Sequence, residues 1–377
     1  MFNFNFLARK EKFFILDVSP ERASGVVMTL DAEKKIKLEK RRDYPERQGL
    51  RGALPFPRLQ GKIIVCVNPE FACKQFIPLV LERERGAGVL EKVEFENLLA
   101  QAVGKLFNQC RRDAGKELGV DEIDVIVADS RVGNFRIDGH RAMSPLGFQT
   151  ERIHAVLEMT FTTREIFSRA KEFLPAHGEF FFTEREQAEL IALGIVKAGR
   201  IGLLAAGAEK SRFFLLDRTP AGPTVSRHTV LWGVRAFADI LAKELLVGAT
   251  AAQRLYRSYL QGEVSEGVQR HFERRFRPEI DSLFKAIRKF EPSGGVYIEG
   301  DDVPFALLAK RSKMFSKPPF EAFLETSGFS IESKDKSMER DLLFRTLAPF
   351  FEFYYDKSDT TINHWLKRRL HWLGSAI

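Results

Sequence analysis

The chain has 377 residues and an apolar fraction of 44%, which is enough for two or more domains with buried cores. Its net charge of +8 comes from Lys and Arg that are spread among Asp and Glu, and no nucleic-acid-binding motif occurs, so we expect no nucleic-acid partner. No uninterrupted apolar run reaches the length of about 18 residues that a membrane-spanning helix needs, and the first ten residues lack the apolar core of a signal peptide.

The three cysteines, Cys66, Cys73 and Cys110, are too few for a disulfide framework or a four-ligand metal site. We expect them to be reduced residues that pack in the core of a cytoplasmic protein. Seven histidines are scattered without the spacing of a hydrolase or a metal site, so we interpret them as polar surface residues.

The first part of the chain predicts a small sheet. Apolar runs at 13–18 and 25–30 flank a polar turn, which is typical of two antiparallel strands. Alternation over 35–41 predicts a third strand, and the β-branched run at 61–67 predicts a fourth. The segment 44–60, which has three prolines, is expected to be a loop.

The next part predicts a small α+β module near 86–175. Its expected elements, in chain order, are a helix at 91–118, a strand at 123–128, a hairpin at 135–139, a strand at 153–160 and a helix at 163–174.

A second strand-turn-strand unit follows at 201–216, so the two parts of the chain open alike, which suggests an internal duplication. Helices are predicted at 233–246, 250–259, 266–290, 303–312 and 342–354, with a short strand at 296–300 before the last two. The helix at 266–290 is basic, and Pro278 is expected to kink or interrupt it.

Three stretches carry a resemblance to a known family. They read Leu-Asp-Val-Ser-Pro at 16–20, Leu-Leu-Ala-Ala-Gly-Ala-Glu at 203–209 and Tyr-Ile-Glu-Gly-Asp-Asp at 297–302. They resemble, in this order, the two phosphate hairpins and the adenosine turn of the actin-like ATPases. The stretches at 136–147 and 186–193 are similar to the small extra subdomain and the connecting helix of FtsA. The chain is therefore similar to the FtsA type, with PilM of type IV pilus assembly as the alternative.

The resemblance implies an α/β, two-lobed actin-like (ribonuclease-H-like) fold with a small inserted α+β subdomain and a C-terminal amphipathic helix. The expected domains are a first lobe at 1–85 with the return of 340–358, an FtsA-type insertion at 86–175, a second lobe at 176–339, and the terminal helix at 359–377.

The resemblance also implies a site for ATP and Mg²⁺ at Asp17, Ser19, Gly207, Ser211 and Gly300. Glycines are expected there because backbone N–H groups must approach phosphates closely, and metal-facing carboxylates are expected beside them. The sequence departs from this pattern at each motif, where it has Ser19-Pro20, Ala205, Ala208-Glu209 and Asp301-Asp302. We therefore expect a pseudo-ATPase with no bound cofactor, and a functional actin-like ATPase is the alternative.

The C-terminal segment is amphipathic at 100° per residue. Its apolar face holds two tryptophans, and its polar face is basic, which is typical of a helix that lies in a membrane interface. The residues expected to bind a membrane are Ile362, Trp365, Leu366, Lys367, Arg368, Arg369, Leu370, Trp372 and Leu373. Two alternatives are a helix docked on the protein's own core and a helix that binds a groove of a partner protein.

Together these features predict an FtsA-like scaffold on the inner face of the cell membrane. It would link an FtsZ-like division polymer to the anionic membrane surface, with self-association as a further property. The first alternative is a PilM-like pilus-assembly scaffold that binds a peptide of a membrane protein, and the second is the functional ATPase.

Overall fold

The structure is a computed structural model that describes residues 10–19, 23–44, 61–84, 88–172, 180–219, 222–300, 302–333, 340–356, 358 and 360–375. The chain divides into two compact units. Unit 1 consists of Met1–Ala192, Thr219–Thr224 and Phe320–Ile377, and unit 2 consists of Leu193–Arg218 and Val225–Pro319. The predicted loop at 44–60 lies outside the described residues, except for Tyr44.

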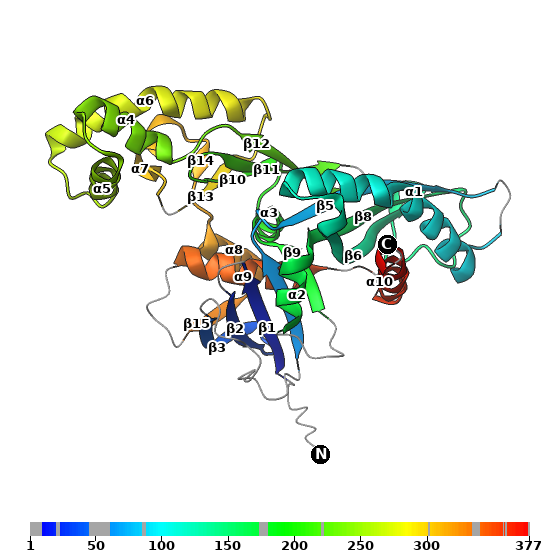
Figure 1. The fold of residues 1–377 in the computed structure, drawn as a ribbon. Coiled ribbons are helices and arrows are strands. Elements are labelled where there is room, and N and C mark those ends of the chain that lie inside the picture. Colours follow the sequence, from blue (N-terminus) through cyan, green and yellow to red (C-terminus); the bar gives the residue numbers. More distant parts are fainter. Residues whose placement is uncertain are drawn as a thin grey trace, which may run out of the picture. The chain divides into compact units, whose positions relative to one another are not determined.

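The first sheet of unit 1 has the strand order β15-β3-β2-β1-β4-β9. Figure 1 shows β1, β2 and β3 together with β15. Strand β1 pairs antiparallel with β2 and parallel with β4, and β4 pairs parallel with β9. The predicted hairpin around the turn at 19–24 is thus formed by β1 and β2. The strands are β1 (Glu11–Val18), β2 (Ala23–Leu30), β3 (Lys35–Tyr44), β4 (Lys62–Val67), β9 (Phe180–Glu184) and β15 (Ser330–Ser333).

The sheet of unit 2 repeats this arrangement in the order β12-β11-β10-β13-β14. Strand β10 pairs antiparallel with β11 and parallel with β13, which pairs parallel with β14. The two predicted hairpins therefore lie in separate sheets at equivalent positions. This duplicated order is the ribonuclease-H-like topology of the two-lobed actin-like fold. The strands are β10 (Ile201–Ala205), β11 (Ser211–Thr219), β12 (Gly222–Val230), β13 (Val296–Glu299) and β14 (Phe315–Ser316).

A separate sheet in unit 1, the inserted sheet, has the order β5-β8-β6-β7. It begins at Ala72, earlier than the boundary at 86 that the sequence suggested, because β5 (Ala72–Glu82) pairs along its whole length with β8 (Arg152–Thr163). Pro78 is tolerated in β5 because β5 is an edge strand. The other strands are β6 (Val125–Ile137) and β7 (His140–Arg141).

Helices cover the sheets of unit 1. Helix α1 (Lys92–Leu118) and the 3₁₀ turn η1 (Glu122–Asp124) precede β6, and α1 packs on the inserted sheet. Helix α2 (Arg164–Glu172) packs instead on the first sheet through Ile166 and Ala170, so the module expected to end at 175 ends with β8. The remaining helices are α3 (Arg185–Val196), α8 (Phe320–Ser327), α9 (Arg340–Tyr355) and α10 (Thr360–Ser375).

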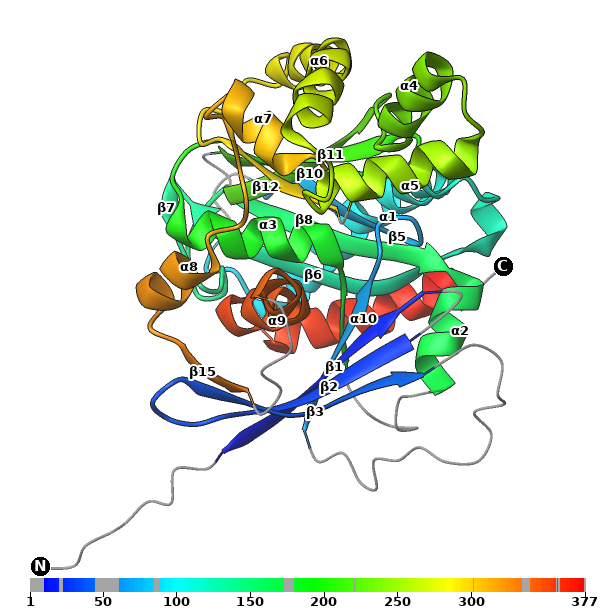
Figure 2. The same cartoon turned by 90° about the vertical axis from the view of Figure 1, so that its left-hand side faces the viewer.

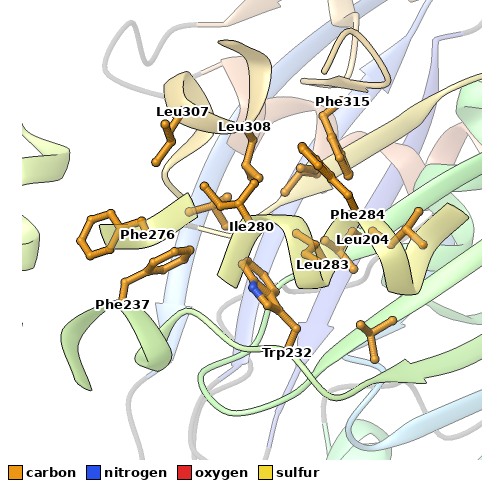
Figure 3. Packing of buried hydrophobic residues seen from close by; sticks show 14 of the residues in the cluster. Leu204, Trp232, Phe237, Phe276, Ile280, Leu283, Phe284, Leu307, Leu308 and Phe315 are labelled. Carbon is orange, nitrogen blue, oxygen red and sulfur yellow. The ribbon is translucent and has the colours of Figure 1, made fainter. Parts of the chain in front are cut away.

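Unit 2 has four helices among its described residues: α4 (Arg235–Leu245), α5 (Ala249–Leu260), α6 (Glu266–Arg288) and α7 (Phe305–Arg311). They share one core with the sheet, in which Phe237, Phe276 and Trp232 pack together (Figure 3). Helix α6 runs through Pro278 without interruption, so of the kink or interruption that the sequence predicted there, the interruption is absent.

The observed units differ from the expected second lobe at 176–339 in three further places. Unit 1 contains β9 with most of α3, the short segment Thr219–Thr224, and the segment from Phe320 to β15. For β9 and β15 the reason is strand pairing, because β9 pairs with β4 and β15 pairs with β3.

All three cysteines are free and buried, as expected of packing residues. Burial raises the pKa of the Cys66 thiol well above its ordinary value and that of Cys110 to about 11. Because the thiolate is the reactive form, Ellman's reagent is expected to leave the native chain unlabelled for as long as it stays folded. Labelling is expected only in denaturant, and fast labelling of the native protein would contradict the burial of these thiols.

Candidate functional site

The carboxylate of the first hairpin is already neutralised. Asp17 lies near the end of β1, opposite Ser24 of β2, and the resemblance implied that it could face a metal. Its Oδ1 instead accepts a hydrogen bond from Nη2 of Arg185, the first residue of α3, in an ion pair. The Arg185 side chain is only 13% exposed. Burial lowers the pKa of its guanidinium, but the negative charges of Asp17 and Glu186 raise this pKa by more, so the net shift is upward. A permanent cation therefore occupies the position in front of Asp17.

The rest of the first hairpin contributes one described candidate. Ser19 follows β1 and is half-buried, and the structure places it in unit 1 beside the end of that strand. Pro20, Glu21 and Arg22 lie outside the described residues. Asp17 and Ser19 lie two residues apart at the end of β1, and the Asp17 carboxylate is engaged by Arg185.

The second hairpin uses its polar groups internally. The hydroxyl of Ser211 donates to the carbonyl oxygen of Trp232 at 2.8 Å and accepts from the Gly207 amide at 3.4 Å. A Cβ on Gly207 would lie 2.2 Å from the carbonyl oxygen of Lys210, so the turn itself requires this glycine. The Ser211 side chain is fully buried, and its hydrogen bond to Trp232 connects the start of β11 to the residues after β12.

Gly300, the candidate of the adenosine turn, lies beside this hairpin. It follows β13 with a φ of 138°, and a Cβ there would lie 3.1 Å from Cβ of Ala206. The Ala206 amide donates to the Glu299 carbonyl oxygen at 2.9 Å, which joins the ends of the two parallel strands. Gly207, Ser211 and Gly300 are therefore brought together in unit 2. Asp301 lies outside the described residues.

A cluster of buried charges in unit 1 was missed by the sequence analysis. Lys74 of β5 has a fully buried side chain that forms ion pairs with Glu352 of α9 and, at 2.9 Å, with Glu158 of β8. Arg131 of β6 lies 3.4 Å from Glu352 and 3.0 Å from Asp356, measured between nitrogen and oxygen. This buried charge cluster joins the inserted sheet to the helix that closes the first sheet.

For two members of the cluster, Asp356 and Arg131, the surroundings favour the charged form. Burial by itself raises the pKa of Asp356, but Arg131 and the bonds to Ser358 outweigh it, so the pKa is lowered. Burial lowers the pKa of Arg131, whereas Glu158, Asp356, Asp129 and Glu352 raise it, and the net shift is upward. The Arg131 guanidinium also lies 4.1 Å from the ring centroid of Phe181 in β9. A sequence signal existed, since Glu352 stands alone among aromatic residues in α9.

A second group of buried carboxylates lies at the start of α3, in the stretch that resembles the connecting helix. Glu184 accepts from the Lys74 amide at 3.0 Å and from the Gln187 side chain at 3.1 Å. Glu189 lies 3.5 Å from Arg345 of α9. Among the described residues, no group of His, Cys, Asp and Glu is arranged so that it could hold a metal ion. The contacts of these carboxylates connect Glu184 to β5 and Glu189 to α9.

The terminal helix α10 is docked on the inserted sheet, along β6 (Figure 2). Ile362, Leu366 and Leu370 are at most 3% exposed and belong to the same core as α1 and the inserted sheet. Trp365 is partly buried against that core. The described part of the apolar face that was predicted to enter a membrane is thus covered by the protein's own sheet, as in the docked-helix alternative.

Polar contacts fix the register of α10. The Asn363 side chain accepts from the Val132 amide at 2.7 Å, and Nζ of Lys367 lies 2.7 Å from Oδ1 of the buried Asp129. Lys367 therefore forms an ion pair within the protein, with Asp129, whereas Arg368 and Arg369 are exposed. The side chains of Trp372 and Leu373 lie outside the described residues. In the part of the chain that the structure covers, no helix is both long and apolar enough to cross a membrane.

Comparisons with known proteins were made at the levels of sequence and structure. No family model and no curated protein matches the sequence. Among solved structures, the chain is similar to one titled a PilM-PilN type IV pilus biogenesis complex, with 13% identity, a TM-score of 0.45, and coverage of 92% of this chain and 98% of that one.

Two further similar structures have lower scores. An actin-like ATPase fold protein of Bacteroides thetaiotaomicron has 8% identity and a TM-score of 0.37, with coverage of 92% and 98% of the two chains. MreB 5 of Spiroplasma citri, bound to AMPPNP, has 10% identity and a TM-score of 0.32, with coverage of 95% and 98%. These likenesses concern the fold alone, and the duplicated strand order of the chain itself is that of the actin-like proteins.

Proposed function

We propose that this chain is a scaffold protein with an actin-like fold that works without nucleotide. The observation that carries the proposal is the ion pair between Asp17 and Arg185, which places a guanidinium where a metal-facing carboxylate would have to be free. Mg²⁺ bound with ATP is held by oxygen ligands, and a buried cation beside the ligand repels it. The residues present therefore do not fit Mg²⁺ at this hairpin.

The second hairpin supports the same proposal. The Gly207 amide and the Ser211 hydroxyl are engaged with each other and with Trp232, so neither group is available for a phosphate oxygen without breaking a buried contact. Ala205 contributes no carboxylate at the end of β10, and the exposed Glu209 carries negative charge at the turn, next to Arg235 at 3.1 Å. Losing a buried hydrogen bond costs about 1–3 kcal/mol, which would have to come from nucleotide binding.

Isothermal titration with Mg-ATP is the test of this proposal. Binding is expected to be no tighter than about millimolar, or about −4 kcal/mol, for the wild-type chain. Arg185→Ser, which frees Asp17, is the variant expected to gain affinity if the guanidinium is what excludes the metal. A low-micromolar dissociation constant for the wild type would contradict the proposal and favour a functional ATPase.

The docking of α10 bears on which partner such a scaffold would take. The FtsA-type role, which joins an FtsZ-like polymer to a membrane through this helix, would require α10 to leave the inserted sheet. The PilM-type role, which binds a peptide of a membrane protein, requires no such release. We therefore favour a partner that meets the folded chain itself, and we propose that any membrane association runs through this partner or through the exposed Arg368 and Arg369 rather than through apolar insertion.

A further inference from the structure

A basic groove lies on unit 2, away from the residues that resemble a nucleotide site. It has a volume of about 710 Å³ and is lined by Asp281, Phe284, Lys285, Arg288, Lys289 and Arg311, from helices α6 and α7. These residues lie at the ends of helices that lead into the amino ends of β13 and β14. Gly207 and Gly300 follow the carboxyl ends of β10 and β13, which are parallel, so the groove belongs to the opposite edge of the sheet.

The charges of the groove are unevenly compensated. Arg311 donates to both carboxylate oxygens of Asp281 at 3.0 Å, which neutralises this pair at one wall. Lys285, Arg288 and Lys289 are exposed, and none of them has an ion-pair partner among the described residues. Phe284 is buried beneath them and stacks on Phe315, with ring centroids 4.9 Å apart. The groove is thus a concave surface with an aromatic floor and three uncompensated cations.

The positions of these cations along the chain favour one kind of ligand. Lys285 and Arg288 stand at positions i and i+3 of α6, and Lys289 is the residue directly after the helix, so the Cβ atom of Lys285 lies about 5–6 Å from those of Arg288 and Lys289. Alternate residues of an extended peptide point to the same side and are spaced by nearly the same distance, about 6.7 Å. The three cations are fewer than the four to eight basic residues of a typical anionic-lipid site, and the buried ring offers no stacking platform for nucleic-acid bases.

We propose that this groove binds an acidic peptide segment of a partner protein. The segment carries two carboxylates on alternate residues, which pair with Lys285 and Arg288, and a small apolar residue that lies over Phe284. The proposal names a partner surface for the scaffold and so rests on the proposed function.

The experiment is a fluorescence anisotropy titration of the full chain, without nucleotide, with a labelled peptide of alternating Glu and Leu. A Gln-Leu peptide is the uncharged control. The test variant is Lys285→Glu with Arg288→Glu. The matched control is Arg254→Glu with Arg257→Glu on α5, because these two residues are also exposed, also at i and i+3, and change the net charge equally.

The groove variant is expected to bind the Glu peptide at least about tenfold more weakly than the wild type, or about 1.4 kcal/mol. The control variant is expected to stay within about twofold of the wild type, and binding is expected to weaken as salt rises from about 0.05 to about 0.5 M. Equal melting temperatures of the two variants exclude a folding defect.

Three results would overturn the proposal. The first is that the Glu and Gln peptides bind with equal affinity. The second is that the groove variant and the control variant lose the same affinity, which would mean that the peptide responds to the net charge of the protein and not to the groove. The third is that phosphatidylserine vesicles or single-stranded DNA bind in a groove-dependent way while the peptide does not. Failure of this proposal leaves the Mg-ATP titration unaffected, and tight Mg-ATP binding with intact peptide binding would overturn the proposed function alone.

Discussion

Replacing Lys74 by methionine is expected to lower the free energy of unfolding of unit 1 by about 3 kcal/mol. The side chain is fully buried and is the shared partner of Glu352 and Glu158. Methionine fills a similar volume, so the loss measures charge rather than packing. Arg131 and Thr183 still contact Glu352 in the variant, which keeps the cost at the lower end of what removing one member of a buried pair causes. Chemical denaturation, monitored by circular dichroism, measures this change in the free energy of unfolding.

Lys92→Met provides the matched control within unit 1. Lys92 is 56% exposed and lies 3.9 Å from Glu96, so its loss is expected to cost less than about 0.5 kcal/mol. Adding Glu352→Gln to Lys74→Met is expected to restore part of the stability, because one of the two carboxylates that lost Lys74 as a partner is then uncharged. If Lys74→Met were as mild as Lys92→Met, the cluster would be unimportant for the joining of the two sheets.

The sequence predicted those parts of the fold that local patterns encode. The apolar runs at 13–18 and 25–30 became β1 and β2, and their counterparts at 201–204 and 212–216 became β10 and β11. Helices α1, α4, α5 and α6 follow from apolar positions at helical spacing. The strand order that makes the fold actin-like was reached only through resemblance, since pairing between strands far apart in the chain leaves no local pattern.

Strand β5 was missed for a physical reason. Lys74, Gln75 and Pro78 interrupt the alternation that marks a strand, and each is acceptable only because of long-range partners. Lys74 is neutralised by Glu352, Gln75 donates to the Cys110 carbonyl oxygen, and Pro78 lies on an edge strand. Buried charges in general cannot be recognised from one sequence, because their partners are set by the fold.

Helix α10 shows the same limit for an amphipathic pattern. The sequence predicted its apolar face correctly, but such a face fits a bilayer and a protein sheet equally well, since both present an apolar surface. What distinguishes them is the polar face. Lys367, expected to meet lipid headgroups, pairs with the buried Asp129, and Asn363 caps the Val132 amide. Neither contact can be inferred from the helix alone.

Leu366→Ala is accordingly expected to destabilise unit 1 by about 2–4 kcal/mol, because it leaves a cavity under a docked helix. Leu366 is 1% exposed in the core that α10 shares with β6 and α1. Arg368→Ala, two residues later on the exposed face, is the control and is expected to change stability by no more than about 0.5 kcal/mol. Denaturation of the two variants side by side measures the difference.

Sedimentation with anionic vesicles separates this docked helix from a membrane anchor in the same samples. The wild type is expected to stay in the supernatant at high salt, because its apolar residues Ile362, Leu366 and Leu370 are already buried in protein and only screened surface charge remains. An anchor would behave in the opposite way. Salt-resistant pelleting of the wild type, abolished by Leu366→Ala without a loss of stability, would mean that α10 leaves the sheet for the membrane.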